Sequence, residues 1–156
     1  MRKSLVISGL LLALVAPGSQ ASSPGALSVS AGRSISTDHQ QLWTNVLFVD
    51  GTGATRRWHG LHWQPAWSLG WIQGRGRAGV DSNLKRDVVV AAAGARVVDW
   101  WGGAFFSFQL AAASRHTDAI SSTAQFVSSL GWQGHHMVVM LRHVSNGDLF
   151  AGPNLG

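Results

Sequence analysis

The sequence predicts an all-β protein, a transmembrane antiparallel up-and-down β-barrel, from two patterns. Large apolar residues recur at every second position along many short segments. After the N-terminus, no segment approaches the roughly 18 consecutive apolar residues of a membrane helix, which excludes a helical membrane protein. A soluble β-sandwich also alternates, but long rows of large residues are hard to fit into its crowded core. Lipid-facing apolar rows and a lumen of small or polar residues explain the pattern with fewer assumptions.

Residues 1–21, MRKSLVISGLLLALVAPGSQA, have the three parts of a secretory signal peptide. A basic start at Arg2 and Lys3 precedes an apolar run, and the small residues Ser19 and Ala21 suit cleavage after Ala21. The apolar run is shorter than the roughly 20 residues that a transmembrane helix needs. We therefore expect residues 22–156 to form a single exported domain that is integral to the bacterial outer membrane.

Composition limits the chemistry of this domain. Loss of Arg2 and Lys3 lowers the formal charge from +5 to +3, so the basic balance is weak and we expect no nucleic-acid partner. The chain has no cysteine, so it can form neither a disulfide framework nor a thiolate metal site. Every acidic residue is an aspartate, and glutamate is absent.

The alternation divides the domain into strands. In LHWQPAWSLGW, Leu61, Trp67 and Trp71 share one face, while Ala66 and Ser68 share the other. Seven strand-like segments follow this rule, near 26–35, 41–50, 59–73, 86–98, 102–114, 121–133 and 135–145. Single-chain bacterial barrels have an even number of strands. We therefore expect eight strands in the full-length protein and a chain that stops before the eighth, unless the count is wrong around VVVAAAGARVV.

The last predicted strand carries polar residues where its apolar row should continue. In MLRHVSNGDLFAGPNLG, the parity of Met137, Val139 and Leu141 places His143 and Ser145 on the same, lipid-facing side. A polar side chain on a lipid face is costly unless it has a task. The simplest alternative is a polar strand end that leads into an Asn-Gly turn.

A serine and a histidine at this spacing can perform nucleophilic hydrolysis. A serine hydroxyl becomes reactive when an adjacent base takes its proton, and imidazole suits that role near neutral pH. Two residues along a strand separate the Cα atoms by roughly 6.6 Å, which an imidazole can span. Asn146 and Gly147 would then supply amide donors where an oxyanion develops.

The run RHVSNGDLFAGPNLG resembles the signature of the outer-membrane lipid A 3-O-deacylases, over about the last 15 residues. SSTAQFVSSLGWQG, with Phe126, is similar to the strand that precedes that signature. The resemblance implies an eight-stranded barrel and a serine esterase that needs no cofactor and removes the 3-hydroxyacyl chain at the 3 position of lipid A. It also implies Ser145 as nucleophile, His143 as base, and support of the oxyanion by Asn146.

The resemblance further implies lipid A, or lipopolysaccharide, and outer-membrane lipids as partners, with Phe126 and Asn154 as expected substrate contacts. In that family a glutamate orients the histidine, and it would follow the Pro-Asn-x-Gly run, just beyond Gly156. The missing glutamate and the missing eighth strand therefore predict the same truncation. The oligomeric state is left open between a monomer and a homodimer.

Weaker alternatives remain. Ser114, His116 and Asp118 resemble a triad but lie in one loop, which rarely fixes such geometry. His59 with His62, and His135 with His136, lack acidic or thiol companions, so we expect no metal site. The other functional interpretations are a non-catalytic small outer-membrane barrel with a structural or adhesive role, and a soluble secreted β-sandwich.

Overall fold

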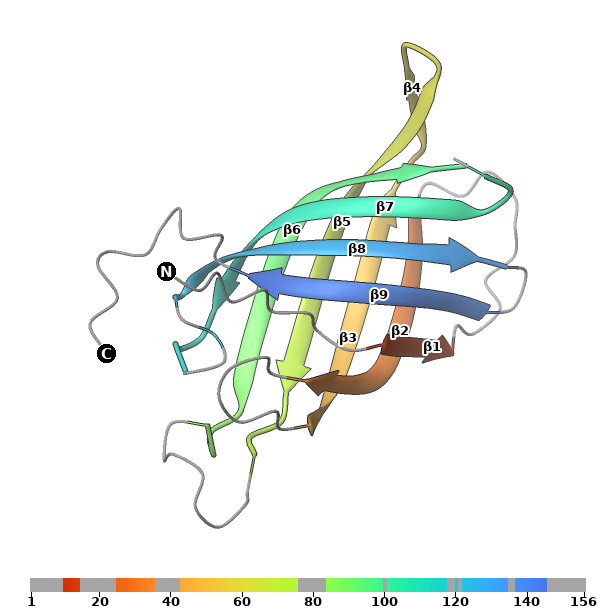
Figure 1. Cartoon of the computed structure of the whole chain (residues 1–156). Helices are drawn as coiled ribbons and strands as arrows, with labels where there is room; N and C mark the ends of the chain where they lie inside the picture. Colours follow the sequence, from red (N-terminus) through yellow and green to blue (C-terminus); the bar gives the residue numbers. More distant parts are fainter. Residues whose placement is uncertain are drawn as a thin grey trace, which may run out of the picture.

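The computed structural model of the chain consists of one antiparallel β-sheet (Figure 1). It describes residues 10–14, 25–35, 43–75, 84–99, 101–117, 120, 122–134 and 137–145. The strands are β1 (Leu10–Leu14), β2 (Gly25–Ile35), β3 (Trp43–Gly53), β4 (Arg56–Trp58), β5 (Leu61–Ile72), β6 (Val88–Val98), β7 (Ala104–Ala113), β8 (Ala124–Gln133) and β9 (Met137–Ser145). Within these residues no helix is long and apolar enough to cross a membrane.

The strands follow an up-and-down order. Their sequence across the sheet is β1-β9-β8-β7-β6-β5-β3-β2, with β4 paired to β5, and every pairing is antiparallel. The sheet curls into a half-barrel (Figure 1). The predicted all-β antiparallel fold and its seven long strands are confirmed, with strand ends shifted by at most three residues. We call the end at which β9 stops the site end of the sheet.

The segment before β5 differs from the prediction. Arg56–Trp58 forms the short strand β4, which pairs with β5 and projects beyond the sheet (Figure 1). His59 and Gly60 connect the two strands with φ angles of 46° and 85°. Positive φ at both central residues is the geometry of a two-residue hairpin whose twist matches its strands. The strand predicted to begin at residue 59 therefore begins at Leu61, after a turn.

A strand also forms inside the predicted signal peptide. β1 pairs with β9 from Leu10↔Leu141 to Leu14↔Met137, and it also contacts β2 at the other edge of the sheet. This extended segment supplies backbone partners to an edge strand, which otherwise presents unpaired amide and carbonyl groups. Within the described residues this pairing extends as far as Leu141. In the described part of the chain, the rest of β9 pairs with β8 alone.

The two faces of the sheet have opposite character. Large apolar side chains are exposed on the convex, outward face, among them Leu27, Leu47, Trp67, Leu69, Trp71, Phe108, Leu110, Leu130, Trp132 and Leu141. Polar side chains are buried on the inward face, which we call the lumen, and include Ser30, Ser68, Ser107, Gln109, Gln125, Ser129 and Arg142. Buried apolar side chains such as Val90 and Phe105 share the lumen with these polar groups, so the unusual feature is the large exposed apolar surface of the outward face. A single curled sheet also rules out the two stacked sheets of a sandwich for the described residues.

Apolar packing fills the lumen at the site end. Val88, Val90 and Val127 are almost fully buried there in one cluster, and Ile120 from the β7–β8 loop joins it. Val144 of β9 packs against the same cluster. Because strand residues alternate between faces, a strand held by an inward Val144 must turn its neighbours in sequence outward.

Glycines make room for large rings within the sheet. Gly70 of β5 is the ladder partner of Phe48 on β3, and Gly131 of β8 is the partner of Phe105 on β7. A Cβ atom added to Gly70 or Gly131 would overlap the facing phenyl ring. Phe48 and Phe105 are consequently buried in a second apolar cluster of the lumen. Pairing of small with large residues lets a narrow lumen close without voids.

Candidate functional site

His143 and Ser145 lie where the sequence places them, on the outward face of β9. Met137 and Leu141 precede them on this face and are exposed, whereas Met140 and Arg142 are buried in the lumen. His143 and Ser145 are themselves half-buried. Val144 between them packs against the lumen cluster, so strand alternation places His143 and Ser145 on the opposite face, at the end of the apolar row.

The neighbouring strand β8 supplies the other half of this surface. Ser145 is the ladder partner of Phe126, and His143 is the partner of Ser128. Directly opposed residues on one face of a sheet have Cβ atoms roughly 4.5–5.5 Å apart. Ser128 and Phe126 are thus the nearest cross-strand side chains to the predicted base and nucleophile.

An aromatic wall continues from Phe126 onto β7. The rings of Phe126 and Phe108 are stacked, with centroids 5.5 Å apart and planes inclined by 28°. Leu110 is the ladder partner of Phe126 on β7, and 60% of its surface is exposed. The polar group of β9 and β8 therefore borders an exposed apolar surface that extends across two strands.

Ser128 is a site residue that the sequence analysis did not single out. It follows Phe126 and precedes Leu130 and Trp132 on the outward row of β8, where it is the only polar member. That interruption of an apolar row is the same signal that drew attention to His143. Ser128 can be assigned to the site only because it lies opposite His143, and the sequence does not reveal this register between β8 and β9.

The remaining predicted positions are only partly covered. Asn146, Gly147 and Asn154 lie outside the described residues. In the alternative loop triad, Ser114 Oγ accepts a hydrogen bond from the Val89 N–H at 3.0 Å, and His116 is exposed. Asp118, the third member, lies outside the described residues as well.

The histidines near the β4–β5 turn have structural contacts. His62 Nδ1 lies 3.5 Å from Asp99 Oδ2, and the His59 ring meets Trp58 edge-on at 5.0 Å. His135 and His136 fall outside the described residues. Among the residues that are described, no three His, Asp or Glu side chains gather as metal ligands would.

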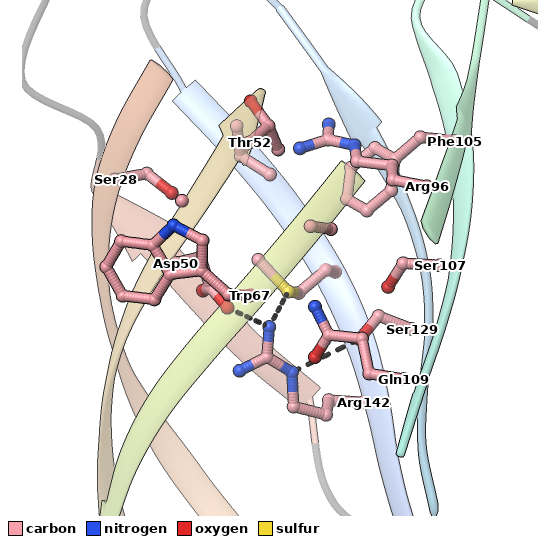
Figure 2. A pocket seen from close by; sticks show the side chains of 14 residues that line it. Ser28, Asp50, Thr52, Trp67, Arg96, Phe105, Ser107, Gln109, Ser129 and Arg142 are labelled. Carbon is pink, nitrogen blue, oxygen red and sulfur yellow. Dashed lines mark hydrogen bonds and ion pairs between the residues drawn. The ribbon is translucent and has the colours of Figure 1, made fainter. Parts of the chain in front are cut away.

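A polar network crosses the lumen beneath the outward site. Arg142 donates from Nη2 to Asp50 Oδ1 at 2.7 Å and from Nε to Ser129 Oγ at 3.1 Å (Figure 2). The Ser68 hydroxyl lies 2.5 Å from Asp50 Oδ1 and 2.9 Å from Gln109 Oε1. The Arg142 guanidinium also lies over the Phe48 ring, 4.2 Å from its centroid. This network links β3, β5, β7, β8 and β9, and it fixes the position of Arg142 between His143 and Leu141.

Comparison with protein-family models, curated proteins and solved structures gives no match for this chain.

The outward group has the components of a hydrolytic site at an apolar surface. It offers a hydroxyl on Ser145, an imidazole on His143 and a second hydroxyl on Ser128. Hydroxyl and imidazole groups beside an apolar surface cost free energy unless they are hydrogen-bonded, which favours a functional reason for their position. The adjacent aromatic wall suits a substrate with a long apolar portion.

Proposed function

We propose that this protein is a serine esterase of the bacterial outer membrane that removes the ester-linked 3-hydroxyacyl chain at the 3 position of lipid A. The observation that carries the proposal is the placement of His143 and Ser145 together on the outward face, at one end of an apolar surface. The sequence resemblance of residues 142–156 supplies the substrate class. Membrane insertion follows in this proposal from the apolar convex face, because only a lipid environment stabilises such a surface in a monomer.

Each residue has a defined part in the reaction. His143 takes the proton of the Ser145 hydroxyl as Ser145 Oγ attacks the ester carbonyl. Collapse of the tetrahedral intermediate breaks the ester C–O bond, and the imidazolium returns its proton to the departing 3-hydroxyl of lipid A. Water, deprotonated by the same imidazole, then cleaves the acyl-serine and releases a 3-hydroxy fatty acid. Asn146 and the Gly147 amide would stabilise the oxyanion.

The surroundings of the pair fit a substrate that remains in the leaflet. The stacked Phe126 and Phe108 rings and the exposed Leu110 form an outward wall beside Ser145. An acyl chain lying along this wall would keep its apolar contacts while its ester reaches the site. Little free energy is then needed to extract the chain from the membrane.

The carboxylate that orients the histidine would approach β9 from the side opposite to β8. On the β8 side, the positions opposite His143 and Ser145 are occupied by Ser128 and Phe126. On the other side, β1 reaches only to Leu141, so among the described strands none lies beside His143 there. The resemblance implies a glutamate just beyond Gly156 for this role, and the aspartate nearest to His143 in sequence is Asp148.

A test uses the purified protein in detergent micelles with a long-chain ester. Ser145→Ala should abolish hydrolysis. Ser114→Ala is the matched control, because Ser114 belongs to the alternative loop triad, and it should leave the rate unchanged. A heat-modifiability gel shows whether each variant keeps its folded barrel. Hydrolysis by folded Ser145→Ala at the unaltered rate would refute the proposed nucleophile.

A further inference from the structure

The lumen contains more positive than negative charge. Three charged side chains line one cavity of about 30 Å³, namely Arg96 of β6, Arg142 of β9 and Asp50 of β3. Asp50 is already engaged by Arg142 at 2.7 Å and by the hydroxyls of Ser68 and Ser30. Its carboxylate therefore balances Arg142, and the charge of Arg96 is left over.

The two side chains that Arg96 contacts directly, Gln133 and Phe105, are neutral. Its Nη2 donates to Gln133 Oε1 at 2.7 Å, and its guanidinium lies over the Phe105 ring, 3.6 Å from the centroid. Among the described residues, Arg96 forms no ion pair with a carboxylate. A guanidinium that is partly removed from water without a counter-ion is costly, and an amide with a ring face offsets only part of that cost.

Both arginines also keep a buried donor unused. Arg96 Nε and Arg142 Nη1 are buried and have no hydrogen-bond partner within the described part of the chain. Arg142 is only 4% exposed, so its Nη1 cannot be satisfied by bulk solvent. In Figure 2 the dashed lines reach Arg142 at its other two nitrogens, and Arg96 lies across the same cavity. Two cationic groups thus line one cavity, and each keeps one buried donor without a partner in the described residues.

We propose that this cavity binds a small monovalent anion of the size of chloride. Arg96 and Arg142 line this cavity, so their guanidinium groups can donate charge-assisted hydrogen bonds to the anion, and Ser28, Thr52 and Ser107 line the same space. A volume of about 30 Å³ exceeds the roughly 10–15 Å³ that one water needs, so the cavity can hold a small ion. The anion neutralises Arg96 and ties β6 to β9 across the lumen.

The test compares chloride with gluconate, an anion too large for the cavity, at matched ionic strength. The midpoint temperature of heat modifiability should rise with chloride concentration in the wild-type protein, because a ligand that binds only the folded state stabilises it. Arg96→Gln should lose this dependence. Arg33→Gln is the matched control, because Arg33 lies on the outward row over Trp43, and it should retain the dependence.

A substitution of Asp50 should strengthen chloride binding, whereas Arg96→Gln should weaken it. Asp50→Asn removes the carboxylate that repels the anion, so chloride should bind about tenfold more tightly and stabilise this variant more than the wild type. Should Arg96→Gln or Asp50→Asn fail to fold, crystals of the wild-type protein grown in bromide decide the question. An anomalous peak is expected in the cavity that Arg96 and Arg142 line. Water alone in the cavity, or a chloride dependence retained by Arg96→Gln, overturns the proposal.

Discussion

Phe126 on β8 is the ladder partner of Ser145 on β9, and both residues lie on the outward face of the sheet. The ring of Phe126 stacks on Phe108 of β7, so an apolar wall begins directly beside the proposed nucleophile. This relationship connects the proposed chemistry with the kind of substrate, because a hydroxyl next to such a wall can meet an ester whose acyl chain stays in lipid.

Phe126→Ala should therefore lower kcat/KM for long-chain esters by about tenfold to a hundredfold, the effect of losing a large apolar contact. The rate for an acetyl ester should stay within about twofold, since a short chain does not reach the wall. Phe106→Ala is the control, because Phe106 lies on the outward face of β7 opposite Leu130, farther from Ser145. An equal loss for both esters would show that Phe126 supports the fold rather than the acyl chain.

His143→Gln should reduce the hydrolysis rate by roughly 10²- to 10⁴-fold, the usual contribution of a general base. The wild-type rate should fall as the pH is lowered, because an imidazolium cannot accept the serine proton. His116→Gln, in the exposed β7–β8 loop, should leave both the rate and its pH dependence intact. Loss of activity in His116→Gln alone would move the site to that loop.

The outward face gives a prediction that depends on depth in the membrane. Leu61 is the first residue of β5, whereas Leu69 lies within the strand, away from both of its ends. Both side chains are exposed. Leu69→Arg should cost roughly 2–4 kcal/mol of folding free energy in a bilayer, and Leu61→Arg at most about 1 kcal/mol. Urea titration of folding into lipid vesicles measures both values. Two equally small costs would argue against a lipid-facing surface.

Asp50→Asn should destabilise the barrel by about 3–5 kcal/mol in gluconate, because it leaves the Arg142 guanidinium buried without its carboxylate. Asp99→Asn should cost less than about 1 kcal/mol, since Asp99 is exposed and its contact with His62 is 3.5 Å long. Asparagine also tolerates the φ of 61° at this position. The same urea titration, repeated without chloride, checks both variants. Similar losses of folding free energy in the two variants would show that the Asp50–Arg142 pair does not stabilise the barrel.

Alternation predicted the faces of the long strands well. In β5, Trp67, Leu69 and Trp71 point outward and Ser68 points inward, as their spacing indicates. The same period placed His143 and Ser145 correctly, because a strand has only two faces and an apolar row identifies one of them. The local sequence pattern is therefore sufficient to predict which of the two faces of the sheet a strand residue occupies.

Relations between distant strands were not predictable from the pattern. Asp50 and Arg142 are 92 residues apart, and their contact depends on how the sheet curls. The opposition of Ser128 and His143 depends on register, which loops and packing set together. The β4 hairpin escaped prediction because Arg56–Trp58 does not alternate and its turn places His59, rather than a second glycine, at positive φ.

Mass spectrometry of lipid A is the most direct test of the central claim, the removal of an acyl chain by Ser145. Lipid A would be extracted from bacteria that express the full-length protein, including any natural sequence beyond residue 156, and from matched cells that express its Ser145→Ala variant at the same folded level. The account predicts a species that lacks one ester-linked 3-hydroxyacyl chain, mapped to the 3 position by fragmentation, in the first cells and not in the second. Unchanged lipid A in both, or the same deacylated species in both, would contradict it.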